Sequence, residues 1–426
     1  MLRLMLEWFN WFRQQPFSFK WFLVVVLVRP FVDALWFVKK MGVFSPLQVI
    51  GVLTILLASV YSIKLKPAKK GLLPIVFIVF AVLLAYNQYL LVAESFSVQT
   101  IGYILRTISP IFIFFYLTRV ITNRERLHGL LDTFLISSIF PLLMLFYEAI
   151  FTPINYVALP ESRGGGYRLT GLYADLFSYM SFVIGDFFIL SYYLFSRHYY
   201  SKLKTSIRYV LLVLVLTVFA LLGLKHQASW GVFLAVILSF GVFISSSIVE
   251  GKKYALLLLI LLVAGGPFLL ERQLNQLFSK EIAAYNVEAN QDRALNGRIK
   301  RWERYFATWD KLSLWSKGIG VSTSNLPFRT KFIMTSSGMH SDYVRFLFGT
   351  GIVGLMSFLL FYVTLAIKSL KLLPPERYFV VTSVLIFSLY SITANPFGSS
   401  GSLFYIIAAG FVIALQPVYK FYQVEL

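Results

Sequence analysis

The chain alternates between long apolar runs and short polar connections. Twelve of these runs contain about 20 mostly apolar residues each, which is the length that a helix needs to cross a bilayer. They lie at residues 19–38, 45–63, 72–92, 100–118, 130–150, 171–195, 207–224, 228–247, 253–270, 343–366, 377–394 and 400–417. The strands of a membrane barrel would give short alternating segments instead. The pattern therefore predicts an all-α fold, a single polytopic membrane domain over 1–426 with about 12 transmembrane helices.

Composition supports a membrane protein. Hydrophobic residues make up 58% of the chain and charged residues 14%, against roughly 45–50% and about 25% in soluble domains. This balance excludes a soluble or disordered chain. The absence of cysteine excludes a disulfide scaffold and any Cys-ligated zinc or iron–sulfur centre. With only 4 histidines, a His-rich metal site is not expected.

Lysine and arginine collect in the connections that follow the even-numbered runs. These residues are Lys64, Lys66, Lys69, Lys70, Arg119, Arg124, Arg126, Arg197, Lys202, Lys204, Arg208, Lys252, Lys253, Lys368, Lys371 and Arg377. The positive-inside rule predicts that this face is cytoplasmic and that both termini lie on it. No cleavage site follows the first run, so we expect it to be retained. The net charge of +20 thus reflects topology in part, and without a basic tail or a binding motif we expect no nucleic-acid partner.

One connection is much longer than the others. It covers 271–342, between the ninth and tenth runs, and is expected to form a large outer, periplasmic helical loop. The segment from Arg272 to Arg345 contains twelve lysines and arginines but only six acidic residues. This surplus of positive charge favours an anionic partner. The alternative is a solvated loop beside anionic lipid.

A helical stretch is predicted within this loop over 298–312, after a break at Asn296-Gly297. On a helix, Arg298, Arg301, Trp302 and Tyr305 would share one face. Arginine grips phosphate oxygens with two parallel hydrogen bonds, and aromatic rings stack on sugars. The alternative is an amphipathic helix that lies on the membrane, and both interpretations can hold together.

A second outer segment, 161–175, contains three successive glycines between Arg163 and Arg168. Glycines let a backbone approach a ligand closely, so these arginines are candidate ligands of an anion. The alternative is an ordinary glycine-rich loop.

Three ionisable residues interrupt the apolar runs themselves. Such residues usually face a cavity or a partner. Arg29 and Asp33 are four residues apart, so they can pair on one helix face. Arg106 has no obvious local partner, which makes it the better candidate for binding a ligand.

His340 lies at the outer entrance to the tenth predicted helix, near Asp342 and Arg345. Histidine there can remove a proton near neutral pH, although a structural role is the common alternative. Downstream, Gly349–Gly354 has the spacing GxGxxG. Because it falls in a membrane helix with no preceding strand, we interpret its small residues as permitting close packing rather than dinucleotide binding.

Several of these segments together resemble the O-antigen polymerase and O-antigen ligase superfamily. The resemblance centres on Met339–Tyr343, followed by Gly349–Leu355. Further elements are Arg29-Pro30, Arg168-Leu169-Thr170-Gly171, Asn296-Gly297-Arg298 with Trp302, and Gly318-Ile319-Gly320. The similarity covers roughly 160–365. One departure is Lys225, where the family often has arginine.

This resemblance implies a membrane glycosyltransferase of polysaccharide or lipopolysaccharide biosynthesis in the bacterial inner (plasma) membrane that needs no metal and no cofactor. Its donor would be a glycan on undecaprenyl pyrophosphate at the outer face. The acceptor would be another lipid-linked glycan, for an O-antigen polymerase, or lipid A–core, for an O-antigen ligase. The lipid bilayer is the remaining expected partner.

The expected catalytic residues are His340, as base or orienter of the acceptor hydroxyl, and Arg298, at the pyrophosphate. Arginines can offset the charge of the leaving pyrophosphate. The expected substrate-binding residues are Arg106, Arg163, Arg168, Lys225, Arg301, Trp302, Tyr343 and Arg345.

Two alternatives remain open at the level of sequence. The loop 271–342 carries little extra apolar surface for a bulky lipid A, which favours a polymerase over a ligase. A secondary transporter or flippase is an alternative of another class. Transporters usually show internal repeats and short loops, and this chain shows no repeat and one long loop.

Overall fold

The computed structural model describes most of the membrane helices and part of the outer loop. The described residues are 2–35, 46–65, 72–94, 98–151, 154, 156–158, 167–169, 171–173, 176–197, 199, 213–214, 217–218, 227–247, 298–320, 341–393 and 402–416. The predicted span 253–270 and nearly all of 207–224 lie outside them.

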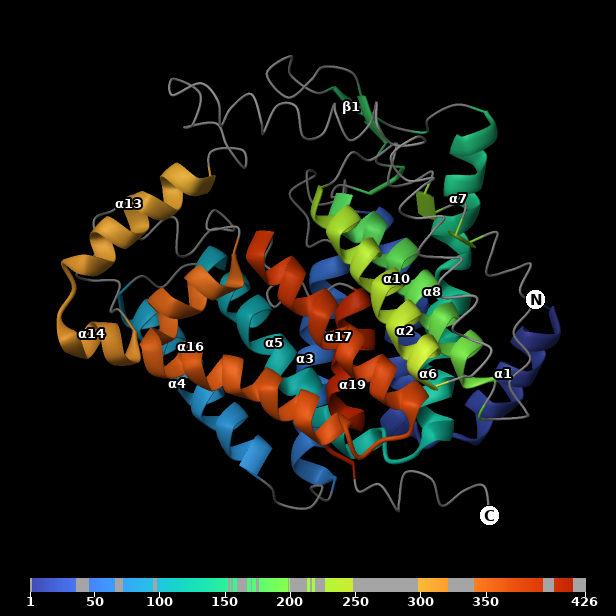
Figure 1. Ribbon diagram of the computed structural model, residues 1–426, viewed down its shortest axis with the longest axis horizontal. Coiled ribbons are helices and arrows are strands. Elements are labelled where there is room, and N and C mark those ends of the chain that lie inside the picture. Colours follow the sequence, from blue (N-terminus) through green and yellow to red (C-terminus); the bar gives the residue numbers. More distant parts are fainter. Residues whose placement is uncertain are drawn as a thin grey trace.

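Helices make up almost all of the described structure (Figure 1). In the first half these are α1 (Leu2–Gln14), α2 (Phe17–Ala34), α3 (Pro46–Lys64), α4 (Leu72–Glu94), α5 (Val98–Val120), α6 (Arg124–Ser137), α7 (Ile139–Ile150) and α8 (Leu176–Ser196). In the second half they are α10 (Gln227–Ser247), α13 (Arg298–Asp310), α14 (Leu314–Ile319), α16 (Asp342–Ser369), α17 (Pro374–Thr393) and α19 (Ser402–Ile413). Strands β1 (Tyr156–Ala158) and β2 (Tyr167–Leu169) form an antiparallel hairpin, which the all-α prediction did not include.

The structure supports a helical membrane protein. Four described helical segments are long and apolar enough to cross a membrane, one of which, Arg124–Glu148, joins α6 and α7. Helices α3, α4, α5 and α19 contain shorter apolar stretches. Their outer faces carry exposed apolar side chains at helical spacing, such as Leu53, Leu56 and Val60 on α3. Water would disfavour so continuous an apolar surface, whereas lipid accommodates it.

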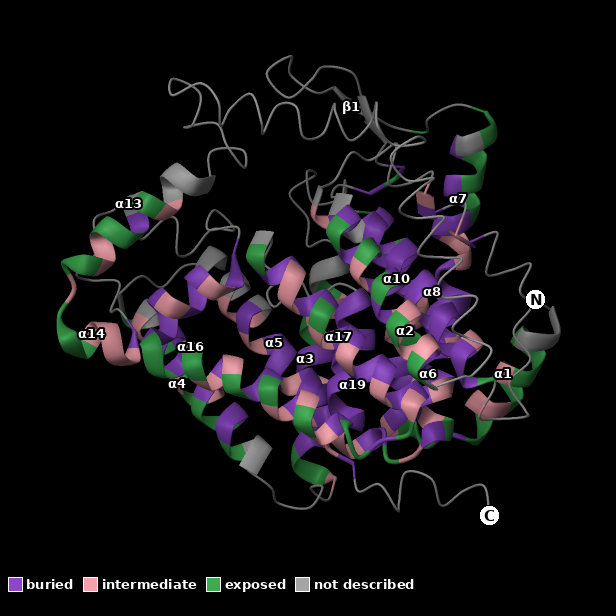
Figure 2. Cartoon of the chain, viewed as in Figure 1, coloured by how far each residue is buried: buried purple, intermediate pink, exposed green. Residues whose placement is uncertain are grey.

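Helices α8 and α19 form the centre of the bundle. From Tyr179 onward α8 is buried along nearly its whole length, and so is α19 (Figure 2). Helix α19 packs against α2, α5, α6, α8 and α17. Helices that are apolar on every side belong in such an interior, because no face of them needs lipid or water.

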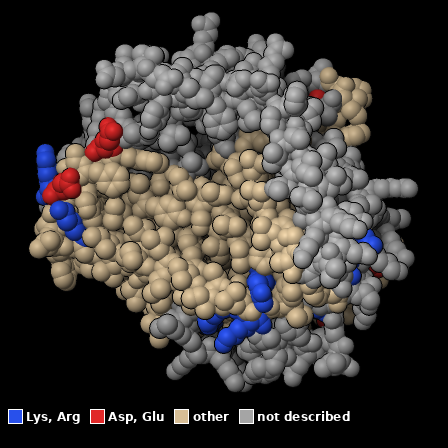
Figure 3. Space-filling model, in the orientation of Figure 1, with Lys and Arg blue, Asp and Glu red and all other residues tan. Residues whose placement is uncertain are grey.

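The helix ends that carry the basic connections meet at one end of the bundle. The Arg119 guanidinium at the end of α5 donates to the Leu65 carbonyl after α3 (2.6 Å), and the Gln416 amide after α19 donates to the Thr118 carbonyl (3.1 Å). Lysine and arginine side chains gather along the lower edge in Figure 3. Positive side chains here complement the partial negative charge of helix C-termini. We refer to this as the basic end.

Two predicted spans are interrupted. The run predicted at 130–150 is divided at Ser138, between α6 and α7, where the Ser138 hydroxyl donates to the buried Asp186 of α8 (2.6 Å). The run predicted at 343–366 lies in α16, but Gly351 there has a φ of 69° and a ψ of −174°, outside the helical region. The residues before Gly351 are buried or half-buried, whereas exposed apolar residues begin directly after it, at Ile352 and Val353.

Candidate functional site

The candidate site lies at the end of the bundle opposite the basic end, where α13 and α14 meet the beginning of α16 (Figure 1). Ser341 caps α16, with its hydroxyl accepting from the Val344 amide (3.5 Å). The same hydroxyl donates to the Ser391 carbonyl at the end of α17 (3.0 Å). The residue before this cap is His340, which is itself outside the described residues.

Helix α13 packs on the first two turns of α16 through an aromatic cluster. Tyr305 of α13 is buried against Val344 and Phe348 of α16, with the Tyr305 and Phe348 ring centroids 6.2 Å apart. Trp302 is half-buried beside this cluster, and the Trp309 ring lies 5.2 Å from that of Phe348. The aromatic part of the predicted arginine–aromatic face thus docks α13 on α16. Trp302, predicted to bind substrate, has a packing role here.

Helix α14 contacts α16 backbone to backbone. A Cβ on Gly351 would lie 2.2 Å from the Gly318 carbonyl oxygen, and a Cβ on Gly320 would lie 2.3 Å from the Gly349 carbonyl oxygen. Gly351 and Gly320 also have positive φ, 69° and 106°, which side chains rarely adopt. The small residues of α16 that were predicted to allow close packing therefore do so. The segment that packs against them is Gly318-Ile319-Gly320 at the end of α14.

Two predicted substrate-binding residues at the start of α16 make internal contacts. The Arg345 guanidinium forms an ion pair with the Asp342 carboxylate (2.7 Å), and both residues are buried. The hydroxyl of the half-buried Tyr343 donates to the Ser388 carbonyl of α17 (3.3 Å). The positive charge of Arg345 is thus paired with a carboxylate of its own helix, and its role in substrate binding stays a prediction.

The β1–β2 hairpin contains Arg168, from the second outer segment predicted at 161–175. Arg168 lies opposite Val157 in its register. The following turn has Gly171 at a φ of 53°, where a Cβ would lie 2.7 Å from the Met144 sulfur. Tyr173, two residues further on, is buried and stacks on Tyr179 (5.3 Å between ring centroids).

Contacts with α7 and α8 fix this segment. The Glu148 carboxylate accepts from the Ile154 amide (3.1 Å) and from the Tyr179 hydroxyl (3.2 Å).

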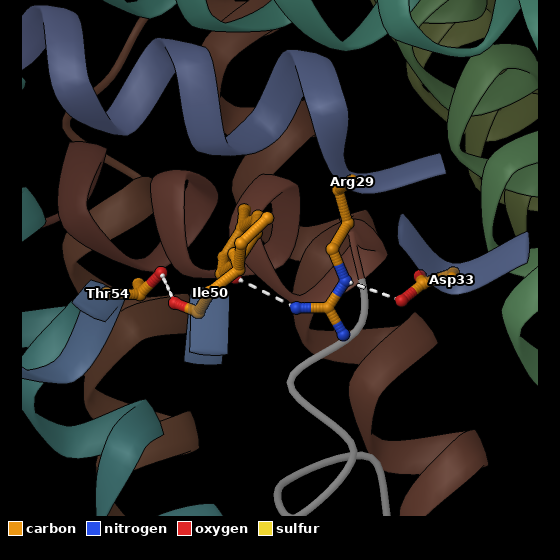
Figure 4. A network of polar contacts seen from close by, with 5 residues as sticks. Arg29, Asp33, Ile50 and Thr54 are labelled. Carbon is orange, nitrogen blue, oxygen red and sulfur yellow. Dashed lines mark hydrogen bonds and ion pairs between the residues drawn. The ribbon is translucent and has the colours of Figure 1, made fainter. Parts of the chain in front are cut away.

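The predicted pair of Arg29 and Asp33 is confirmed. The Arg29 Nε donates to the Asp33 carboxylate (2.8 Å), and both side chains are buried (Figure 4). A guanidinium nitrogen of Arg29 also donates to the Tyr405 hydroxyl of α19 (3.5 Å). Such a pair is expected in an apolar interior, where a lone charge would be very costly. Sequence reasoning missed Tyr405, since nothing local links residues 376 positions apart.

The remaining predictions concern residues whose side chains the structure does not describe. Arg106 lies in α5, Arg168 in β2, and Arg298 and Arg301 in the first turn of α13. His340, Arg163 and Lys225 lie outside the described residues. Within the described part of the chain, no three His, Asp or Glu side chains are close enough together to hold a metal ion.

Comparison with known proteins gives one match. Residues 212–359 match a family model described as Wzy_C, O-antigen ligase. The matched segment includes α10, α13, α14 and the first part of α16, so it contains the packed elements described above. No curated protein matches the chain.

Proposed function

We propose that this chain, whose residues 212–359 match the O-antigen ligase family model, is a membrane glycosyltransferase of the O-antigen polymerase and ligase superfamily that acts on undecaprenyl-pyrophosphate-linked glycans. The observation that carries the proposal is the docking of α13 on α16. The helix that bears Arg298 and Arg301 packs on the helix that begins directly after His340, through Tyr305 and Phe348. This arrangement supports a site in which phosphate-binding arginines and a histidine serve one reaction.

We propose the topology that the charge pattern predicts. Both termini and the basic end would be cytoplasmic, with α13 and α14 in the outer loop 271–342. Described helices lie in ten of the twelve predicted ranges, counting the divided run as one, and the count of twelve spans is part of this proposal.

The proposed reaction is a direct displacement at the anomeric carbon of the donor. The acceptor hydroxyl oxygen would form a bond to the anomeric carbon. At the same time the bond between that carbon and the phosphate oxygen would break, and undecaprenyl pyrophosphate would leave. His340 would take or orient the hydroxyl proton. Arg298, with Arg301, Arg168 and Arg106, would stabilise the negative charge that grows on the pyrophosphate, with weaker contributions from Arg163 and Lys225. Because Asp342 already neutralises Arg345, we assign Arg345 to positioning the start of α16.

The acceptor that we propose is another lipid-linked glycan, which makes the enzyme a polymerase. One observation favours the ligase as a second candidate. The expectation of little apolar surface in the outer loop is wrong, since Leu314 is 88% exposed, Trp315 73% and Phe306 42%. An apolar surface of this kind on α13 and α14 suits either the bilayer or the acyl chains of a lipid A acceptor.

Reconstitution separates these activities. Purified protein in liposomes would receive one defined undecaprenyl-pyrophosphate oligosaccharide, and the products would be resolved on a gel. A ladder of repeat lengths is expected from a polymerase. A single larger product that appears only after lipid A–core is added would instead establish a ligase. No product with either acceptor, from protein that unfolds cooperatively, would refute the transferase and favour a transporter.

Variants test the assigned residues in the same assay. We expect Arg298→Ala and His340→Ala to abolish transfer, because charge stabilisation and proton transfer at the reacting centre would be lost. The matched control is Lys311→Ala, which removes an exposed cation just after α13 and should leave transfer near normal. Normal transfer by either site variant would remove that residue from the mechanism.

A further inference from the structure

Helix α1 is an amphipathic helix that the pattern of long apolar runs does not predict. It lies at the lower right in Figure 1, beside α6 and away from the hairpin. On a helix its described residues divide into three faces. One contains Trp8, Trp11 and Phe12, a second contains Met5, Leu6 and Phe9, and the third contains Glu7, Asn10 and Gln14.

The tryptophan face fixes α1 on α6. The Trp8 indole donates to the Thr133 hydroxyl (2.8 Å), and the Trp11 indole donates to the Glu125 carboxylate (2.7 Å). The Trp11 ring also fills the space above Gly129, where a Cβ would lie 2.0 Å from it. These contacts hold α1 in one rotational setting, so its other two faces have defined directions.

The junction with α2 is fixed as well. The Lys20 ammonium of α2 donates to the Arg13 carbonyl at the end of α1 (2.7 Å) and lies 5.9 Å from the Phe12 ring. Pro16 caps the start of α2 between the two helices. Helix α1 therefore leaves the bundle at a set angle.

The second face exposes large apolar side chains with no described contact to cover them. Met5 is 41% exposed, Leu6 58% and Phe9 50%. This surface continues along α2, where Phe17, Val24 and Phe31 are exposed at a spacing of seven residues. Residues seven apart share one face of a helix, and that face of α2 belongs to the lipid-facing surface of the bundle. The chain therefore passes from the exposed apolar face of α1 directly into a helix that also exposes apolar side chains.

Charge points to the same partner. Arg13 is exposed, with its guanidinium 5.9 Å from the Phe9 ring, and α6 begins beside α1 at the basic end. Amphipathic helices with basic and aromatic residues at the apolar–polar boundary lie in the plane of a membrane, where the cations meet lipid phosphates.

From this geometry we infer that α1 is an in-plane membrane anchor. It lies in the headgroup layer at the basic end, inserts Met5, Leu6 and Phe9 among the acyl chains, and turns Glu7, Asn10 and Gln14 toward water. Since α1 is fixed to α6 and α2, the bilayer surface sets the depth of both helices, and α2 carries the Arg29–Asp33 pair near its other end.

The absence of cysteine in the chain allows a direct test in the full-length protein. Single cysteines at Phe9→Cys, Gln14→Cys and Leu56→Cys would be labelled with an environment-sensitive fluorophore, and the proteins placed in nanodiscs that contain phosphatidylglycerol. Leu56 is a lipid-facing reference on α3, 56% exposed, and the exposed Gln14 is the matched polar-face control. Cooperative unfolding of each variant would verify that it is folded.

We expect nitroxide-labelled lipid to quench Phe9→Cys severalfold more strongly than Gln14→Cys, and to approach the quenching at Leu56→Cys. A water-soluble quencher should give the reverse order for the two α1 positions. Equal access of water to Phe9 and Gln14 would overturn the proposal. Protection of Phe9 from both quenchers would also overturn it, because that result means a protein surface covers the face.

Discussion

The backbone contact between α14 and α16 gives a sharp prediction for a single methyl group. The change is Gly351→Ala. The new Cβ would lie 2.2 Å from the Gly318 carbonyl oxygen and 2.5 Å from the Ile319 amide nitrogen. These are backbone atoms, so no side-chain rotation can relieve the overlap.

The magnitude has two parts. A left-handed backbone costs a residue with a side chain roughly 1–2 kcal/mol, and Gly351 has a φ of 69°. Overpacking typically adds about 1–3 kcal/mol. Together they give roughly 2–5 kcal/mol against the docked state. A helix as short as α14 is unstable by itself in water, so we expect the strain to be relieved by undocking and unwinding α14 rather than by unfolding the bundle.

Hydrogen exchange measures this directly. The Lys317 amide donates to the Ser313 carbonyl (2.9 Å) and the Gly320 amide to the Ser316 carbonyl (3.0 Å). A loss of 2 kcal/mol or more should raise their exchange rates by at least about tenfold, since 1.4 kcal/mol corresponds to a factor of ten. Amides in α8 should keep their protection, and glycan transfer should fall, because α14 links α13 to the start of α16.

A matched control separates strain from a general effect of glycine replacement. Gly241→Ala in α10 places its Cβ where no atom lies within 4 Å, and in a helix this change should stabilise by roughly 0.5–1 kcal/mol. Unchanged exchange at Lys317 and Gly320 in Gly351→Ala, with normal transfer, would refute the reasoning that the two glycine elements hold the outer loop.

Three further predictions concern other contacts. Asp33→Ala leaves Arg29 buried without its ion-pair partner and should cost about 3–5 kcal/mol in thermal unfolding, whereas Arg29→Leu combined with Asp33→Leu should cost clearly less; equal losses would contradict the pairing argument. Gly129→Ala places a methyl group in the space of the Trp11 ring and should lower the free energy of unfolding by about 1–3 kcal/mol, with a changed tryptophan emission as α1 shifts. An unchanged emission would contradict the packing of Trp11 on Gly129. Phe348→Ala removes the ring on which α13 packs and should cost about 3–5 kcal/mol locally, which amide exchange in α13 would report, while Phe348→Leu should lose less; normal protection in both variants would count against the docking.

Sequence pattern predicted those features that depend on local spacing. The pair of Arg29 and Asp33 follows from a separation of four residues on a helix. The close approach at Gly349 and Gly351 follows from small residues in an apolar helix. Most membrane helices were predicted because about 20 apolar residues are a strong local signal.

Features that depend on distant contacts were not predictable. The division of a span at Ser138 has a local signal that the sequence analysis did not use, since Pro141 has no N–H to donate to the Ser137 carbonyl. The hydrogen bond from Ser138 to Asp186, 48 residues away, had no such signal. The partner of Arg29 on α19 is likewise remote. Helix α1 was missed because it mixes apolar and polar residues and is too short to span a membrane. The packing role of Trp302 could not be read from its helix face, since a face does not reveal what lies against it.

The central position of α19 bears on the order in which the protein assembles. Among the described helices α19 is made last, yet it packs against α2, α5, α6, α8 and α17. The earlier helices can insert one by one as independent units, but the space that α19 fills stays open until the ribosome has passed Ser402. Contacts of such large sequence separation form late. Biogenesis of this protein therefore requires a partly assembled bundle to persist in the membrane, with its most buried helix arriving as the closing step.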